Sequence, residues 1–338
     1  VGACLALGAA IGAIAGGRLS DHYGRRHNIL LLAGIFILGT LGCTFAPNIA
    51  VLYLFRFILG IAVGGASATV PVYLAESAPT RVRGSLIALD QFMIVAGQLL
   101  AYSMNAILSS AHGGPQVYVT EDPSGTLTGG QWYPWDQVQN VSSAVITAGD
   151  GMAWRWMLVL ATIPAICLWL GMRLMPESGR WYASKDRYYE AIGALKRIRD
   201  PKLDNLSEEI AQIAELQQRE DAQGHWSLRR TASVAWTRRL LLIGVGLACF
   251  DQLTGINTAM YYLPKILAAA GFSAADSITL NVITGAVACA GAGFGLYLVS
   301  KLARRHVGIY QETGVTLSLF SLAIIFGVGI SPYVQADG

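Results

Sequence analysis

Long apolar runs alternate with short polar links along the whole chain. Each run is about 20 residues long, which is enough to cross roughly 30 Å of hydrocarbon as a helix. Because backbone polar groups inside a bilayer must be paired within the chain, such runs form helices. The pattern therefore predicts eight transmembrane helices, at about residues 1–16, 29–47, 50–74, 86–108, 153–175, 240–268, 277–299 and 309–332.

Composition strengthens this prediction. Hydrophobic residues make up 54% of the chain, charged residues only 13%, and the mean hydropathy is +0.47. Soluble domains carry about twice that share of charge. We therefore expect an all-α membrane protein with eight transmembrane helices. An alternative for the first run is the core of a signal peptide, but no basic stretch precedes it.

Lys and Arg residues occur only in alternate links. The links after the first, third, fifth and seventh runs are basic, whereas the other links, including 109–151, contain neither residue. Since basic loops stay on the cytoplasmic side, the basic links are expected to be cytoplasmic and both chain ends to face outward. The chain does not begin with Met, and we expect one span to precede it and further spans to follow it.

Two segments are too polar to cross the membrane. The outer link 109–151 is rich in Gly, Ser, Thr and Pro and is expected to be an irregular surface loop. The inner segment 184–236 has apolar residues at helical spacing on both sides of Asp200-Pro201, which predicts short amphipathic cytoplasmic helices, the second starting at Asn205. The expected units are an N-terminal helical bundle at 1–183, a cytoplasmic linker at 184–236 and a partial C-terminal bundle at 237–338.

Several function classes find no support in the pattern. The five cysteines all lie in apolar runs, the five histidines are scattered without metal-ligand spacing, and no phosphate-binding loop is present. The net charge of +3 reflects the basic cytoplasmic links, so a nucleic-acid partner is not indicated. We expect no enzyme activity, no cofactor and no bound metal. Glycines recur four apart at Gly8, Gly12 and Gly16, at Gly60 and Gly64, and at Gly291 and Gly295, which predicts close helix packing.

One basic link is partly repeated. The stretch 17–26, GRLSDHYGRR, follows the first run, and 299–305, VSKLARR, follows the seventh. The arginine pairs coincide when the two are aligned. Paired halves are typical of transporters whose substrate site lies near the bilayer midplane between them.

The segment 18–26, RLSDHYGRR, resembles the loop motif of the major facilitator superfamily. Three further stretches resemble the sugar porter family within it, and they occur in the family's order: RFILGIAVGG at 56–65, PESGRW at 176–181 and DQLTGIN at 251–257. The resemblance covers nearly the whole chain and implies spans two to nine of twelve. It further implies a multi-pass cell-membrane protein of the bacterial proton/sugar symporter type.

The resemblance also implies a cytoplasmic gate. Physically, Gly24 permits a tight turn, and Asp21 is placed to meet arginines or a helix N-terminus. These contacts must break when the cavity opens inward. The alternative is that the charges are solvated topology signals. The expected gate residues are Asp21, Gly24, Arg25, Arg26, Glu76, Arg83, Glu177, Arg180 and Arg304.

Neutral amides inside the membrane are suited to a sugar, because they donate to and accept from hydroxyl groups without the desolvation cost of a charge. By resemblance, Gln98, Gln252 and Asn257 contact substrate; the alternative is hydrogen bonding between helices. Asp251 stands where the family more often has glutamine. Its carboxylate is expected to accept sugar hydroxyls, and the alternatives are a cationic ligand, a protonatable group, or a residue with no specific role.

The expectation of proton coupling rests on a single residue. Arg56 resembles an arginine that lies near an acidic residue of the first span in proton-coupled members. Tyr261 and Tyr262 are expected to gate the outer side of the site. The expected partners are a monosaccharide or polyol, protons and the lipid bilayer. A facilitative uniporter and a non-transporting sugar sensor are the alternatives.

Overall fold

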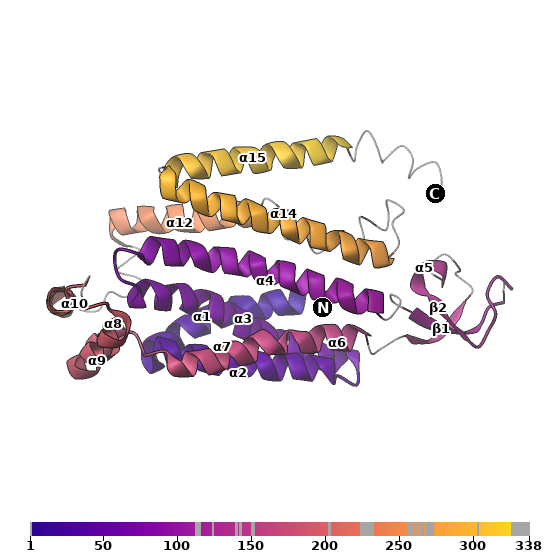
Figure 1. The fold of residues 1–338 in the computed structure, drawn as a ribbon, viewed down its shortest axis with the longest axis horizontal. Helices are drawn as coiled ribbons and strands as arrows, with labels where there is room; N and C mark the ends of the chain where they lie inside the picture. The colour runs from indigo at the N-terminus through magenta and orange to yellow at the C-terminus, as the bar shows by residue number, and fades with distance from the viewer. Residues whose placement is uncertain are drawn as a thin grey trace.

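The fold is a bundle of long helices with a small sheet at one end and short helices at the other, as seen in a computed structural model (Figure 1). The structure describes residues 2–111, 116–123, 125–138, 141, 144–149, 153–201, 204–223, 233–253, 255, 260, 262–263, 267, 274–302 and 304–325. The long helices are α1 (Gly2–Tyr23), α2 (Arg25–Thr44), α3 (Ile49–Ser77), α4 (Arg83–Ala111), α6 (Ala153–Leu160), α7 (Thr162–Leu174), α12 (Ala235–Leu253), α14 (Ala274–Lys301) and α15 (Arg304–Ile324).

Six of the eight predicted spans are confirmed by length and composition within the described residues. They are α1, α2, α3, α4, the α6–α7 run at Trp154–Leu174, and the Ser277–Leu298 part of α14. The other two runs, 240–268 and 309–332, coincide with α12 and α15, and both extend into residues outside the described part. The protein is therefore a membrane protein whose spanning part is helical.

Glycines bring α1 and α3 into direct backbone contact. A Cβ atom at Gly8 or Gly12 would collide with the backbone carbonyls of Phe57 or Ile61, and one at Gly16 would lie 2.6 Å from the Cα of Gly65. Small residues are what allow helices in lipid to approach this closely. The prediction of close packing is confirmed for this pair of helices.

The same prediction is wrong for Gly291 and Gly295. A Cβ atom at either position would meet no described atom within 4 Å. Instead, α14 packs against α4 through Gly285, where a Cβ would lie 2.9 Å from Cδ2 of Tyr102. The two glycines line a cavity between helices, so their small size leaves space rather than closing it.

The outer link is not irregular, as the sequence led us to expect. It forms β1 (Gln116–Glu121), β2 (Gln131–Pro134) and β3 (Val145–Gly149) in the antiparallel order β2-β1-β3, with one helical turn, α5 (Trp135–Val138). Alternating β-branched and aromatic residues outweigh the Gly and Pro content, and Val119 becomes fully buried. Gly130, at φ +82°, supplies the left-handed residue before β2.

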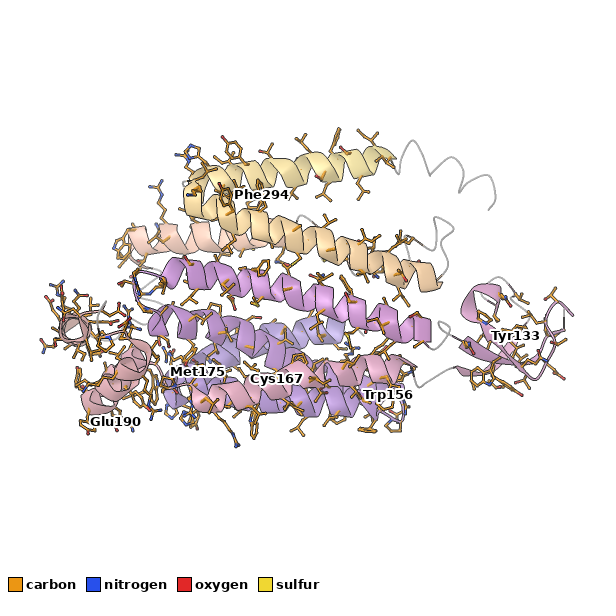
Figure 2. The ribbon with its side chains drawn as sticks, viewed as in Figure 1. Tyr133, Trp156, Cys167, Met175, Glu190 and Phe294 are labelled. Carbon is orange, nitrogen blue, oxygen red and sulfur yellow. The ribbon has the colours of Figure 1, made fainter. Side chains whose placement is uncertain are left out.

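The two predicted helices are present in the inner segment as α9 (Tyr188–Ile198) and α10 (Leu206–Gln223), and a short helix that was not predicted, α8 (Gly179–Ala183), precedes them. Helix α9 ends before Asp200-Pro201, and α10 begins after Asn205, whose Oδ1 accepts a long hydrogen bond of 3.5 Å from the Glu208 amide. These helices lie at the end of the bundle opposite the sheet, as the labelled Glu190 on α9 and Tyr133 on β2 show (Figure 2). The boundaries of the three expected units stay a prediction.

The α1–α3 contact can be tested with two adjacent glycines. Replacing Gly16 with Val should lower the stability of the folded protein by about 1–3 kcal/mol or more, because the new atoms overlap the α3 backbone. Replacing Gly17 with Val is the matched control, since a Cβ there meets nothing within 4 Å. Thermal unfolding in detergent measures both, and equal melting temperatures for the two variants would contradict the packing.

Candidate functional site

The turn between α1 and α2 is the centre of a partly buried charge network at the end of the bundle opposite the sheet. Gly24 adopts φ +100°, and a Cβ there would collide with the carboxylate of Glu177. Only glycine therefore fits this position, both for its backbone conformation and for the space. The next residue, Arg25, donates from Nε and Nη2 to the two carboxylate oxygens of Glu76, at 3.1 Å each, and pairs with Asp21 at 2.9 Å.

The Glu177 carboxylate is fully buried at the start of α2. It accepts hydrogen bonds from the backbone amide of Arg26, at 2.9 and 3.1 Å, and from the amide of Ser178 at 3.0 Å. Nδ1 of His27 lies 3.2 Å away. A carboxylate is stabilised at this place because the first amides of a helix lack partners of their own and carry partial positive charge.

Arg26 ties the start of α2 to the end of α7. Its Nε donates to the carbonyl of Met172 at 3.0 Å, and its Nη2 donates to the carbonyl of Arg173 at 2.9 Å. The last carbonyls of a helix need such donors. The first two residues of α2 therefore contact different helices, Arg25 contacting α3 and Arg26 contacting α7.

Only some of the expected gate residues are in contact with one another. The network joins Asp21, Gly24, Arg25, Arg26, Glu76 and Glu177. The side chain of Arg83 donates only a long hydrogen bond of 3.4 Å to the Ala78 carbonyl, and the side chain of the exposed Arg180 makes no hydrogen bond or ion pair with any described residue. The side chain of Arg304 lies outside the described part. Their role as a gate stays a prediction.

A second buried ion pair was missed by the sequence analysis. Arg199, at the end of α9, donates from Nε and Nη2 to the carboxylate of Glu209 at 2.7 and 2.6 Å, and from Nη1 to the carbonyl of Ser77, the last residue of α3, at 2.5 Å. The pair therefore fixes α10 to the end of α3. Both residues belong to a stretch of the sequence that is rich in charged residues. Their spacing along the chain therefore does not distinguish them from neighbouring charged residues that are exposed to solvent.

Inside the membrane, Gln98 of α4 faces the segment that follows α12. Its Nε2 donates to the hydroxyl of Tyr102 at 2.8 Å and lies 3.1 Å from the sulfur of Met260. The expected continuous span 240–268 is instead interrupted, because α12 ends at Leu253 and Gly255 has φ +79°. Discontinuous helices are common at transporter substrate sites, since they expose backbone groups to a ligand.

The other expected substrate residues are only partly placed. Gln252, in α12, and Tyr262 are exposed. Asp251 lies in α12 with its side chain outside the described part, and Asn257 and Tyr261 fall wholly outside it. Nε of Arg56, on α3, is buried without a hydrogen-bond partner among the described residues. No assignment of a substrate or proton role is tested by these positions.

A cavity of about 760 Å³ lies between α4, α14 and α15, and its lining is mostly apolar. Figure 2 shows Phe294, one of its lining residues, on α14 beside α15. Gln91 contributes an amide to the wall, and its neighbour Asp90 is a partly buried carboxyl within the same apolar run. Neither residue was among those expected from the sequence, although a charged residue inside a predicted span is itself a signal of function.

The carboxylate of Glu177 should matter more to folding than an exposed glutamate does. Replacing Glu177 with Ala leaves the buried amides of Arg26 and Ser178 without an acceptor, which should cost about 1–3 kcal/mol. Glu177→Gln retains one acceptor oxygen and should cost less. Glu190→Ala, an exposed pair member on α9, is the control. Melting temperatures that fall equally in all three variants would contradict this reading.

The attachment of α10 should depend on pH. Hydrogen bonds from Arg199 hold the pKa of Glu209 below its ordinary value of 4.5, against an opposing effect of burial. A depressed pKa stabilises the folded state above that value, and this contribution is lost as the pH falls and Glu209 takes up a proton. The melting-temperature difference between wild type and Glu209→Gln should therefore shrink below about pH 4.5. Glu208→Gln is the control, and a difference that is the same at all pH values would refute the pairing.

A family model and several known proteins match nearly the whole chain. Residues 1–334 match the model of the family described as sugar (and other) transporter. The major myo-inositol transporter IolT of Bacillus subtilis (strain 168) is 39% identical over 335 residues, which are 98% of this chain and 63% of the relative. The galactose-proton symporter of Escherichia coli (strain K12) is 34% identical over 324 residues, 96% of this chain and 58% of the relative.

Solved structures give the same fold. The xylose transporter XylE from E. coli, in a partially occluded inward open conformation, superposes with a TM-score of 0.71 at 24% identity, covering 98% of this chain and 69% of that one. The proton:xylose symporter XylE of the major facilitator superfamily, bound to 6-bromo-6-deoxy-D-glucose, has a TM-score of 0.68 at 26% identity, covering 89% and 59%. The chain spans less than two thirds of the curated relatives it matches. It belongs to the sugar transporter family of the major facilitator superfamily.

Proposed function

We propose that the protein, with the spans its relatives have beyond this chain, carries a monosaccharide or polyol across the cell membrane by alternating access, in symport with protons. The observation that supports this most directly is the position of Gln98. Its amide lies at the seam between α4 and the interrupted segment after α12, in contact with Met260. Gln252 is at the end of α12, just before the break at Gly255, and Asn257 follows that break in the sequence, so we assign both amides to the same site as Gln98.

The chemistry of these groups suits an uncharged polyhydroxylated substrate. Each amide offers two donors and an acceptor, and a sugar hydroxyl can both donate and accept. Because the amides are neutral, they lose less on leaving water than a charged side chain does. Gln91 adds an amide at the wall of the cavity between α4, α14 and α15, and we assign to Asp251 the role of accepting hydroxyl hydrogens.

Alternating access requires contacts at the inner face that can separate as a unit. The Arg25–Glu76 pair and the hydrogen bonds of Glu177 join the α1–α2 turn to the ends of α3 and α7. These are charge-assisted contacts between elements distant in sequence, which is the kind of interaction that holds one state of a switching interface. We assign them to the closed inner face of the transporter.

Proton coupling is assigned to Arg56. Its buried Nε lacks a hydrogen-bond partner among the described residues, and a buried N–H without a partner requires an acceptor. A carboxyl that gains and loses a proton supplies one. Relatives named as proton symporters, for galactose and for xylose, support the same coupling.

Uptake by the full-length parent in proteoliposomes tests both parts of the proposal. Labelled myo-inositol is tested first, because the relative at 39% identity is named a myo-inositol transporter; xylose, glucose and galactose follow. We expect saturable uptake of at least one, reduced tenfold or more in Gln98→Ala and altered in Asp251→Asn. Gln218→Ala, an exposed glutamine on α10, is the control.

An inward proton gradient separates symport from facilitated diffusion. Accumulation above the outside concentration should occur in wild type and disappear in Arg56→Gln, which still equilibrates substrate. Equilibration without accumulation in the wild type would identify a uniporter. If no sugar enters vesicles containing folded, correctly oriented protein, the transport proposal fails and a sensor on the same fold takes its place.

A further inference from the structure

A second cavity lies at the cytoplasmic end, away from the membrane cavity. It encloses about 310 Å³ between α8, α10 and the charge network at the α1–α2 turn. That volume is at the lower end of the range of small-molecule sites. One wall is polar, formed by Arg25, Glu76 and Arg180, and the other is apolar, formed by Trp181 of α8 with Ile213 and Leu216 of α10.

The two arginines of this cavity differ in their partners. Arg25 is saturated, since its guanidinium contacts Glu76, Asp21 and the carbonyl of Ser20. The side chain of Arg180, an exposed residue, has no hydrogen bond or ion pair with any residue that the structure describes. The cavity therefore holds one guanidinium whose five donors are available.

The surroundings of Arg180 carry an excess of positive charge. Arg180 and Arg199 both act electrostatically on Arg83, and all three arginines act on the single carboxylate of Glu209. Arg199 already occupies both oxygens of that carboxylate. Nε of Arg83 is buried without a hydrogen-bond partner among the described residues. Arg83 and Arg199 do not line the cavity; among the residues that do, Arg25 is paired with Glu76, so the Arg180 guanidinium is the positive charge left without a carboxylate partner.

We propose that this cytoplasmic cavity binds a phosphate monoester or phosphate itself, with Arg180 as the principal contact. A phosphate group carries between one and a half and two negative charges near pH 7 and three acceptor oxygens, which suits a guanidinium with free donors in a region of further arginines. A guanidinium binds phosphate through paired, charge-assisted hydrogen bonds. The apolar wall of Trp181, Ile213 and Leu216 accommodates the carbon part of an ester.

Occupation of the site has a structural consequence. The ligand contacts α8 and α10 together with the Arg25–Glu76 pair, so it fastens the cytoplasmic helices to the membrane bundle. This site is separate from the substrate residues on α4 and α12, and it binds its ligand whether or not the protein transports a sugar.

Titration calorimetry on the purified full-length protein in lipid-free detergent tests the site, with inorganic phosphate and glucose 6-phosphate as probes at constant ionic strength. We expect saturable binding that weakens about tenfold or more in Arg180→Gln, because one charge-assisted contact is lost. Arg219→Gln is the matched control, since Arg219 is an exposed arginine of α10 paired with Glu215. Leu216→Glu places a carboxylate in the cavity wall without touching the arginines, and should also abolish binding.

A lipid headgroup carries the same phosphate chemistry, so the protein is also reconstituted in nanodiscs with and without phosphatidic acid. Competition between phosphatidic acid and free phosphate, lost in Arg180→Gln, assigns the site to a lipid source; binding of the free esters alone assigns it to a soluble metabolite. Equal affinities in wild type, Arg180→Gln and Leu216→Glu, or no saturable binding of any probe to protein with an unchanged melting temperature, overturn the proposal.

Discussion

The buried carboxylate of Glu177 is the interaction on which the inner half of the molecule depends. A charge removed from water is tolerated only where hydrogen bonds replace its hydration. Here the backbone amides of Arg26 and Ser178 do so, and they can because Gly24 brings the α1–α2 turn within reach. The position of Arg25 and Arg26 follows from that turn, and through them the alignment of α3 and α7.

Sequence reasoning succeeded where one physical signal dominates. A run of about 20 apolar residues has few alternatives to a membrane helix, and glycines four apart on α1 and α3 left little room for other packing. Asn205 before α10 was recognisable because a capping residue acts on its own helix. In each case the signal can be read from the residues of one helix or of one of its faces.

It failed where the outcome depends on distant partners or on competing local signals. The outer sheet was missed because Gly and Pro content masked the alternation in Val117, Tyr118 and Val119, whose pairing with two other strands is long-range. The break at Gly255 was missed because hydropathy does not register backbone conformation. Gln91 and Asp90 were passed over for Gln98, although one helix carries all three. Residues outside the described part leave Asn257 and Tyr261 as predictions.

The reach of Glu177 along the chain bears on the order in which the bundle assembles. Its carboxylate contacts amides and side chains about 150 residues earlier. Because translation proceeds from the N-terminus, α1, α2 and α3 enter the membrane well before the residue that completes their inner face exists. Until then the Arg26 amide has no carboxylate to pair with, and the contacts of Arg25 with Glu76, Asp21 and the Ser20 carbonyl hold the nascent turn. The packing of α1, α2 and α3 at this end is therefore completed only when the residues just before α8 have been synthesised. The contact of Glu177 with Arg26 then closes a loop of about 150 residues.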